Sequence, residues 1–190
     1  MALRSVAGWL LLSLGLSVAG AAQADSWRPP RLKVVASNDG EALARINPGG
    51  FNEGKRPDVT LYAYDDGEGQ YSLTQRFKLD NPLAPVDVLL TGQGELVTLD
   101  EWAQVGRGIV LAVYSADGKR RYTRTLAQLL GEEPAGKAPQ SVSSTWWRCR
   151  KPELSWGDRL LLLTTYDNGR LEVELSSGEV KYQPGTGKCE

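Results

Sequence analysis

Six dipeptides that end in glycine recur along the chain, each between two short apolar segments. They are Asp39-Gly40, Asp66-Gly67, Gln93-Gly94, Asp117-Gly118, Asn168-Gly169 and Ser177-Gly178. Asn-Gly and Asp-Gly tolerate the positive φ values that two-residue hairpin turns require. Turn signals at such short spacing leave room for strands but for few helices. The pattern therefore predicts an all-β, antiparallel fold.

The segments beside these turns have the composition of β-strands. Residues 59–64, Val-Thr-Leu-Tyr-Ala-Tyr, alternate apolar and polar or aromatic positions. Residues 86–90 and 96–99 are rich in valine and leucine and flank one turn dipeptide. β-Branched and aromatic residues with a period of two are typical of strands that pair across a tight turn. We therefore expect hairpins joined in sequence order.

Helical signals are scarce. Residues 125–130, Thr-Leu-Ala-Gln-Leu-Leu, predict a short helix that ends at Gly131. The residues that follow, 131–144, are rich in glycine, proline, alanine and serine, and Val142 is their one large apolar side chain. This composition is typical of connections on a protein surface. We expect a flexible loop there.

The strand pattern repeats three times. Residues 31–80, 84–130 and 145–183 each contain about four predicted strands around a glycine turn. These units resemble the β-meanders that serve as blades of a propeller. Because closed propellers have about four blades or more, three units predict either an incomplete stack of blade-like sheets or a sandwich.

The first 24 residues have the organisation of a secretory signal peptide. Arg4 precedes an apolar run over residues 6–18, and Ala22-Gln23-Ala24 supplies the small residues that signal peptidase recognises. The run is shorter than the about 20 residues that a transmembrane helix needs. We predict a signal peptide over residues 1–24, one domain over residues 25–190, a periplasmic or secreted location, and no membrane span after cleavage.

Two cysteines, Cys149 and Cys189, are present. An even pair in an exported chain favours a disulfide over a redox or metal pair. Closing a loop of this length stabilises a fold by about 4 kcal/mol on the loop-entropy model. We therefore expect a structural bond between the two cysteines that ties the C-terminus to the rest of the domain.

The composition argues against several kinds of chemistry. The net charge is −1 and the chain contains no histidine. A chain without a basic excess has no electrostatic attraction for nucleic acid. Without histidine there is no Ser-His-Asp relay and no histidine-ligated metal. We expect no catalytic residues, no metal site and no cofactor.

One acidic cluster resembles part of a calcium loop. Asp65, Asp66 and Glu68 surround Gly67, and calcium prefers carboxylate oxygens on such loops. The full EF-hand pattern of alternating acids is absent. A solvated hairpin turn is the favoured interpretation.

A second acidic cluster precedes a glycine-rich loop. Asp100 and Glu101 lie beside Trp102, as a carboxylate pair beside an aromatic platform does in glycosidases. Neighbouring residues on a strand point to opposite faces, so these two acids do not naturally converge. We favour a structural interpretation, in which Asp100 caps a turn and Trp102 packs on the core.

The richest candidate for a binding surface is a group of aromatic and basic residues. Trp146 and Trp147 are neighbours and cannot both face the core of a strand, so one of them is expected to be exposed. With Arg148, Arg150 and Trp156 they have the composition of protein-interface hot spots, and tryptophan also stacks on sugars. We predict a binding site at Trp146, Trp147, Arg148 and Trp156. The alternative is that the tryptophans cover the disulfide and a second small core.

Residues 86–120 carry a resemblance to known sequences. They read V-D-V-L-L-T-G-Q-G-E-L-V-T-L-D-E-W, then a glycine loop, then I-V-L-A-V-Y-S-A-D-G-K. This resembles a segment of uncharacterised secreted bacterial proteins of β-repeat type. The resemblance implies export and β structure, and it implies no reaction.

Taken together, these observations favour an exported, soluble, non-enzymatic binding or interaction protein, with an inhibitor or an immunity-type partner among the roles that fit. Its partner is expected to be a protein or a glycan. The alternative is a carbohydrate-binding or cell-wall-binding module, which the tryptophans favour. A hydrolase that uses carboxylates near Asp65 or Asp100 is the third hypothesis.

Overall fold

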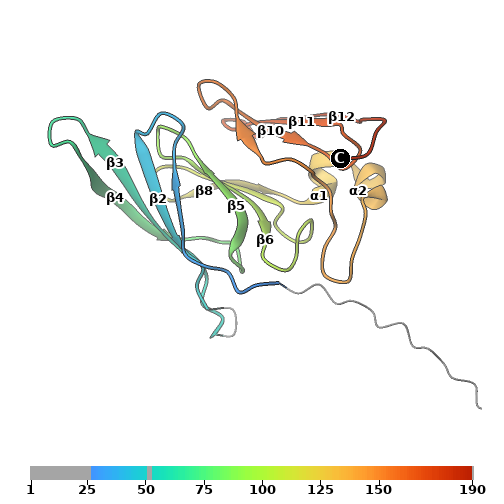
Figure 1. The fold of residues 1–190 in the computed structure, drawn as a ribbon, viewed down its shortest axis with the longest axis horizontal. Helices are drawn as coiled ribbons and strands as arrows, with labels where there is room; N and C mark the ends of the chain where they lie inside the picture. Colours follow the sequence, from blue (N-terminus) through green and yellow to red (C-terminus); the bar gives the residue numbers. More distant parts are fainter. Residues whose placement is uncertain (1–26, 51–52, 190) are drawn as a thin grey trace, which may run out of the picture.

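The computed structural model describes residues 27–50 and 53–189, and the predicted signal peptide lies outside them. Within the described part, the strands form three four-stranded antiparallel sheets, each built from four strands in sequence order (Figure 1). The first sheet contains β1 (Lys33–Ala36), β2 (Ala42–Asn47), β3 (Asp58–Asp65) and β4 (Gln70–Lys78). The second contains β5 (Pro85–Leu90), β6 (Leu96–Glu101), β7 (Leu111–Tyr114) and β8 (Arg120–Arg124). The third contains β9 (Glu153–Leu154), β10 (Leu160–Thr164), β11 (Arg170–Glu174) and β12 (Val180–Gln183). The all-β fold of three meander units is thus confirmed.

The glycine-ended dipeptides connect neighbouring strands of one sheet, as expected. Gly118, between β7 and β8, has a φ of 81°. A Cβ at this position would lie 2.6 Å from the Cγ atom of Phe77 on β4, so the turn of one sheet is packed tightly against another. Asn168, between β10 and β11, has a φ of 59°, which asparagine tolerates better than most residues. Local turn chemistry therefore sets these hairpins.

The second sheet is buried on both faces. Leu96 and Tyr114 are paired across β6 and β7 and pack against the first sheet. Val97 and Val113 are paired next to them and pack against the third sheet. Because successive residues on a strand point to opposite faces, both sides of β6 and β7 must be apolar. The chain is therefore a stack of three sheets, with the second between the other two (Figure 1).

The first strands of the three sheets meet along one groove of about 480 Å³. It is lined by residues of β1, β5 and β9 together with the segments next to them. In propellers the blades are likewise arranged around a central channel. We call this the axial groove. Its presence identifies the units as blade-like sheets around a shared axis rather than the two layers of a sandwich.

The short helix expected at residues 125–130 is α1 (Leu126–Leu130). Thr125 is its N-cap and forms a capping box with Gln128, which satisfies backbone donors at the helix start. Leu126, Leu129 and Leu130 are buried against the core between the second and third sheets. The leucines thus anchor the helix to the sheets.

Residues 131–144, expected to be a loop throughout, contain a second helix, α2 (Glu132–Lys137). Pro134 lies in its first turn, where proline is tolerated. An ion pair between Glu133 and Lys137, at 2.7 Å, spans the helix, and the Tyr166 hydroxyl donates a hydrogen bond to the Pro134 carbonyl at 2.9 Å. Charge spacing and this tertiary contact outweigh the loop-like composition. No helix in the described residues has the length and apolar character to cross a membrane.

Candidate functional site

The disulfide predicted from the sequence is present. Cys149 and Cys189 are bonded, with their Cα atoms 5.7 Å apart. The bond joins the segment before β9 to the segment after β12. The Cys149 amide also donates to the Thr164 carbonyl at 3.1 Å, so this segment pairs locally with the end of β10. Residues 146–149 are therefore fixed to the third sheet by a covalent and a hydrogen-bonded connection.

The two neighbouring tryptophans face opposite sides of this segment. Trp147 is completely buried, whereas 44% of Trp146 is exposed. The Trp146 ring stacks on Trp27, with ring centres 6.1 Å apart and planes at 8°. Trp147 belongs to the core between the second and third sheets. The sequence argument that one of the two is exposed thus identifies Trp146 as the accessible ring.

Beneath this surface, Asp100 connects the second sheet to the tryptophan segment. Its Oδ1 atom accepts hydrogen bonds from Trp147 Nε1 and the Gly106 amide, both at 2.8 Å, and its Oδ2 atom accepts one from Arg148 Nε at 3.0 Å. Burial raises the pKa of Asp100, while Arg148 and the other donors oppose that shift. Asp100 has a φ of 55°, a left-handed conformation for which aspartate is one of the better residues.

Arg148 carries the network outward to β5. Its second contact is an ion pair with Asp87, whose side chain is 38% exposed, whereas that of Arg148 is 11% exposed. Lys33 approaches from β1 and donates to the Pro85 carbonyl at 3.1 Å. Burial lowers the pKa of Lys33, and the charge of Asp87 partly offsets this. Asp87 also lines the axial groove, so the network runs from the groove to the buried Asp100.

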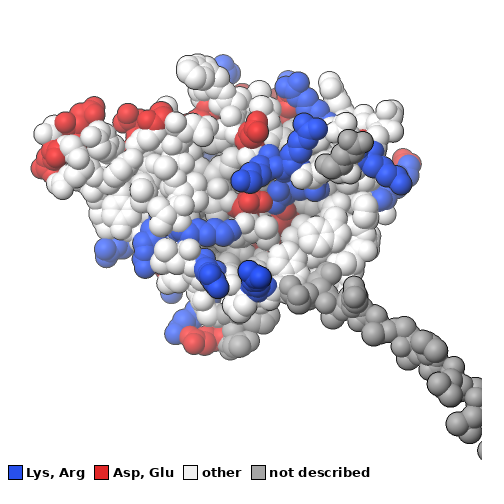
Figure 2. Space-filling view, viewed as in Figure 1, with Lys and Arg blue, Asp and Glu red and all other residues white. Residues whose placement is uncertain are grey.

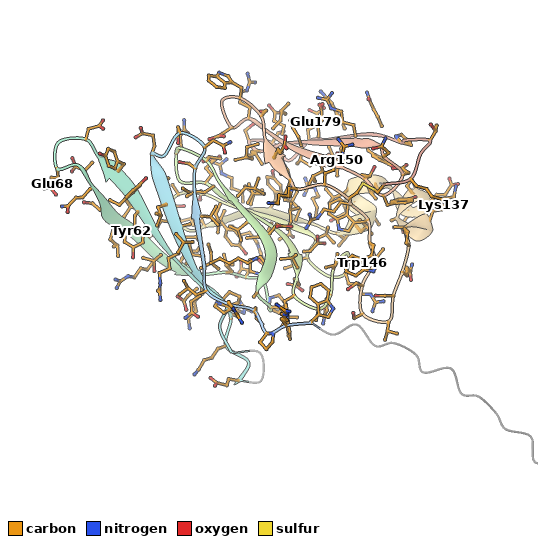
Figure 3. All side chains as sticks on the ribbon, viewed as in Figure 1. Tyr62, Glu68, Lys137, Trp146, Arg150 and Glu179 are labelled. Atoms are coloured by element: carbon orange, nitrogen blue, oxygen red, sulfur yellow. A yellow bond between two sulfur atoms is a disulfide. The ribbon has the colours of Figure 1, made fainter. Side chains whose placement is uncertain are left out.

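A pocket of about 590 Å³ lies beside the disulfide, which forms part of its wall. Its other walls include Trp146, Tyr166 and the basic side chains of Lys137, Arg148 and Lys188. We call it the disulfide pocket. Lys137 ends α2 and Trp146 lies in the segment that follows it, and Figure 3 labels both on the same side of the molecule. The pocket is thus lined by an exposed indole, three cations and the carboxylate of Asp167. Two of the cations, Lys137 and Arg148, are themselves in ion pairs.

Positive charge extends beyond the pocket. Figure 2 shows lysine and arginine side chains gathered over the part of this face where Figure 3 labels Arg150. Arg150, Lys151 and Lys188 are exposed, and in the described residues none of them forms an ion pair. The face around the disulfide is therefore suited to an anionic or acidic surface.

The four residues predicted as a binding site do not form one surface. Trp146 and Arg148 line the disulfide pocket, and Trp147 lies beneath it. Trp156 is fully exposed at the turn between β9 and β10, where it borders a different hollow with Asn38. Trp146 and Arg148 thus lie together at one pocket, Trp147 is buried below it and Trp156 lies apart, and the binding role of these residues stays a prediction.

The two acidic clusters lie in different surroundings. Asp65 Oδ1 accepts from the amides of Gly67 and Glu68, at 2.9 and 3.2 Å, as in an ordinary turn. Glu101 is buried, and its Oε1 atom has no hydrogen-bond partner. Burial raises the pKa of Glu101 to about 7. The described residues contain no group of three or more potential metal ligands.

The hydrogen bonds of the second acidic cluster partly match the structural interpretation. Asp100 accepts the Gly106 amide at the loop after β6, as a turn cap does, but it is also the centre of a buried charge network. Trp102 is half-buried, and its Nε1 atom donates to the Arg28 carbonyl at 2.8 Å. Trp102 therefore holds the N-terminal segment that also carries Trp27.

Sequence reasoning missed several residues of the site, namely Trp27, Asp87, Lys137, Tyr166 and Lys188. For two of them, the neighbouring sequence contains a signal that could have been used. Asp87 is an acid within an apolar strand, and Lys188 adjoins a cysteine that the disulfide brings to Trp146. The other three reach the pocket only through the packing of distant segments.

Comparisons with known proteins identify no family for this chain. No protein-family model matches the chain, and no curated protein matches its sequence. Among solved structures, the periplasmic gluconolactonase of Pseudomonas aeruginosa is similar with a TM-score of 0.41 and 16% identity. The similarity covers 83% of this chain, which spans only 40% of that protein's length. The predicted kinship with secreted β-repeat proteins has no sequence match behind it and stays a prediction.

Proposed function

We propose that this chain is an exported, non-enzymatic binding protein, and that a partner protein with an acidic surface docks on the disulfide pocket. The observation that carries the proposal is the exposed Trp146 ring, which stacks on Trp27 at a rim bordered by Lys137, Arg148 and Lys188. Tryptophan and arginine dominate the binding energy of protein interfaces. Acidic groups on the partner would complement Lys188, Arg150 and Lys151, which are exposed beside the pocket and form no ion pair with a described residue.

The surroundings of Trp146 also support binding. The ring is held by Trp27, and the segment that carries it is fixed by the disulfide and by the Asp100–Arg148 pair. A side chain that is ordered before binding loses less conformational entropy when the partner arrives. The same rigidity suits an inhibitor or immunity-type protein, which presents one fixed surface.

The carboxylates favour binding over hydrolysis. Asp100 is completely buried, and only 2% of Glu101 is exposed to solvent. They also have different partners, since Asp100 contacts Trp147 and Arg148 while Glu101 lies beside Asn81. Glycosidases need two carboxylates that face one substrate bond. These two acids are therefore poor candidates for that chemistry.

A second candidate function is recognition of a glycan in the same pocket. Its volume, about 590 Å³, lies within the range of about 300–1,000 Å³ that is usual for small-ligand sites. The flat exposed face of Trp146 and the nearby Tyr166 ring are surfaces on which sugar rings stack.

The test is site-specific photo-crosslinking in the cell envelope. A photoreactive phenylalanine analogue at position 188 reports on the pocket, and the same analogue at position 156 is the matched control at an exposed position outside it. We expect one protein to crosslink from position 188 and not from 156, and Trp146→Ala, but not Trp156→Ala, to weaken its affinity at least tenfold. Crosslinking from 156 alone would contradict the proposal. Binding of a glycan instead of a protein at the pocket would favour the second candidate.

A further inference from the structure

The two ends of the sheet stack are open. The second sheet is covered on both faces, whereas the first and third sheets are each covered on one. On the first sheet, the outward residues Val34, Tyr64, Tyr71 and Leu73 are 39–57% exposed. We call the outward face of β1–β4 the first end face. Its apolar side chains are of the kind that another sheet would cover in a closed propeller.

Two arginines lie within this apolar face. Strand pairing places Val34, Arg45, Thr60 and Arg76 in one row across the sheet. The next row contains Ala36, Leu43, Tyr62 and Leu73. Arg45 and Arg76 are exposed, and neither forms an ion pair with a described residue. In these two rows they are the only charges, and both are positive.

The opposite end of the stack has the complementary pattern. We call the outward face of β9–β12 the last end face. Strand pairing places Glu153, Leu162, Glu172 and Lys181 in one row and pairs Leu160 with Glu174 in another. Leu160 and Leu162 are half-buried. Arg170 lies in the next row of the same face and forms an ion pair with Glu172 at 2.5 Å. The face thus carries three carboxylates against Lys181 and Arg170, and its negative balance is opposite in sign to the arginines of the first end face.

From this complementarity we propose that a second copy of the chain covers both open ends. The first end face of each copy packs on the last end face of the other, with Arg45 and Arg76 opposite Glu153 and Glu172. The contact is heterologous, so it must either close into a ring or propagate. Because the three sheets of one copy already share an axial groove, two copies give a ring of six sheets, within the about four to eight blades that closed propellers have.

The area of the faces favours closure with two copies. The strands of the third sheet have 2, 5, 5 and 4 residues. At ~3.3 Å per residue and ~4.8 Å between strands, its face is roughly 250 Å², and this smaller face limits the contact. One end-to-end contact then buries about 500 Å² in total, which is the size of a crystal contact, whereas the two contacts of a closed pair bury about 1,000 Å², at the lower limit for a specific interface. The axial groove becomes the wall of a channel that both copies complete.

The experiment measures the mass in solution of the mature protein, residues 25–190, by analytical ultracentrifugation over the micromolar range. We expect a dimer for the natural sequence. Reversing the charges of one face, with Arg45→Glu and Arg76→Glu, is expected to give a monomer, and so is Glu153→Arg with Glu172→Arg. Circular dichroism checks that both variants remain folded. Each variant then has end faces of one sign, so an equal mixture of the two is expected to restore a dimer.

Each alternative has its own result. A natural protein that stays monomeric overturns the proposal. A dimer that survives reversal of the last end face indicates that two first end faces pair with one another, which also overturns it. Masses that grow beyond the dimer with concentration show a contact that propagates instead of closing. The outcome is separate from the proposed function, because the variants leave Trp146 and the disulfide pocket unchanged.

Discussion

The end of β6 places two carboxylates in contrasting regions of the interior. On the side of the third sheet, Asp100 accepts three hydrogen bonds, one of them from the Arg148 guanidinium. On the other side, Glu101 lies beside Asn81 and has one oxygen without any partner. Both residues are buried. Although the two acids are adjacent in the sequence, both carboxylate oxygens of Asp100 accept hydrogen bonds, whereas one oxygen of Glu101 accepts none.

The difference teaches that burial alone does not decide what a buried acid does. Removing a carboxylate from water is costly unless donors replace the lost solvation. Around Asp100, burial also raises the pKa, but an indole, a backbone amide and a guanidinium oppose the rise, and the ion pair with Arg148 joins the end of β6 to the tryptophan segment. Around Glu101, burial raises the pKa to about 7, so the neutral acid is the form that fits. The following predictions test this contrast.

The largest effect is expected when Asp100 is removed. Asp100→Ala removes the buried carboxylate that pairs with the half-buried Arg148 guanidinium. It also leaves the Trp147 Nε1 donor without its acceptor. Breaking such a pair costs about 3–5 kcal/mol, which urea unfolding followed by tryptophan fluorescence would measure. Asp66→Ala, at an exposed turn, is the control and should cost under about 0.5 kcal/mol. A loss below about 1 kcal/mol for Asp100→Ala would show that the network does not stabilise the fold.

The second effect concerns the covalent connection that holds Arg148 against Asp100. Replacing both cysteines, Cys149→Ser with Cys189→Ser, removes a bond between positions separated by 40 residues. We expect a loss of about 2–4 kcal/mol in the free energy of unfolding. Reducing the natural protein is the matched comparison and should give the same value. If both changes leave stability intact, the hydrogen bonds of the segment suffice to hold Arg148.

The third prediction uses pH to separate the two acids. The pKa of Glu101 is raised from 4.5 to about 7 by burial, so the folded protein binds more protons than the unfolded chain between these values. The stability that the neutral acid contributes is complete at low pH and is lost as pH rises through about 7, by up to about 3 kcal/mol.

Glu101→Gln, which is neutral at every pH, supplies the comparison. We expect it to remove the part of the pH dependence that lies between pH 4.5 and about 7 and to make the protein more stable than the natural sequence at about pH 8. Urea unfolding at these pH values measures both. An unchanged pH dependence in Glu101→Gln would mean that another group titrates in this range and that Glu101 is charged in the folded protein.

A feature of this structure could be predicted from the sequence when it depends on neighbouring residues, and could not when it depends on contacts between residues far apart in the chain. The hairpins follow from dipeptides such as Asn168-Gly169, whose conformation is local, and the disulfide follows because the chain contains two cysteines. The prediction for residues 131–144 was wrong because α2 depends on the Glu133–Lys137 pair and on Tyr166, which a count of glycine and proline ignores.

The candidate site was harder to predict than the fold. Trp146 and Arg148 were predicted because their types are typical of binding surfaces, but the stack of Trp27 on Trp146 joins residues that are far apart in the sequence. The pair of Arg148 with Asp87 requires the second sheet to pack beside the third. Trp156 was grouped with the others by type, and its position at a turn of the third sheet separates it from them. Composition thus identified kinds of residue, and only packing decided which of them meet.

The smallest effect is expected at the outer end of the same network, where Asp87 contacts Arg148. The Asp87 side chain is 38% exposed, so water can replace much of what the ion pair supplies. Asp87→Asn should therefore cost under about 1 kcal/mol, several times less than Asp100→Ala, although both acids contact the same guanidinium. Added salt should weaken the contribution of Asp87 and leave that of Asp100 almost unchanged, because buried pairs are screened much less. Urea unfolding of the two variants at low and high salt measures this. If Asp87→Asn costs as much as Asp100→Ala, then Asp87 at the axial groove is a main partner of Arg148. The exposed end of the network would then stabilise the fold as much as the buried end.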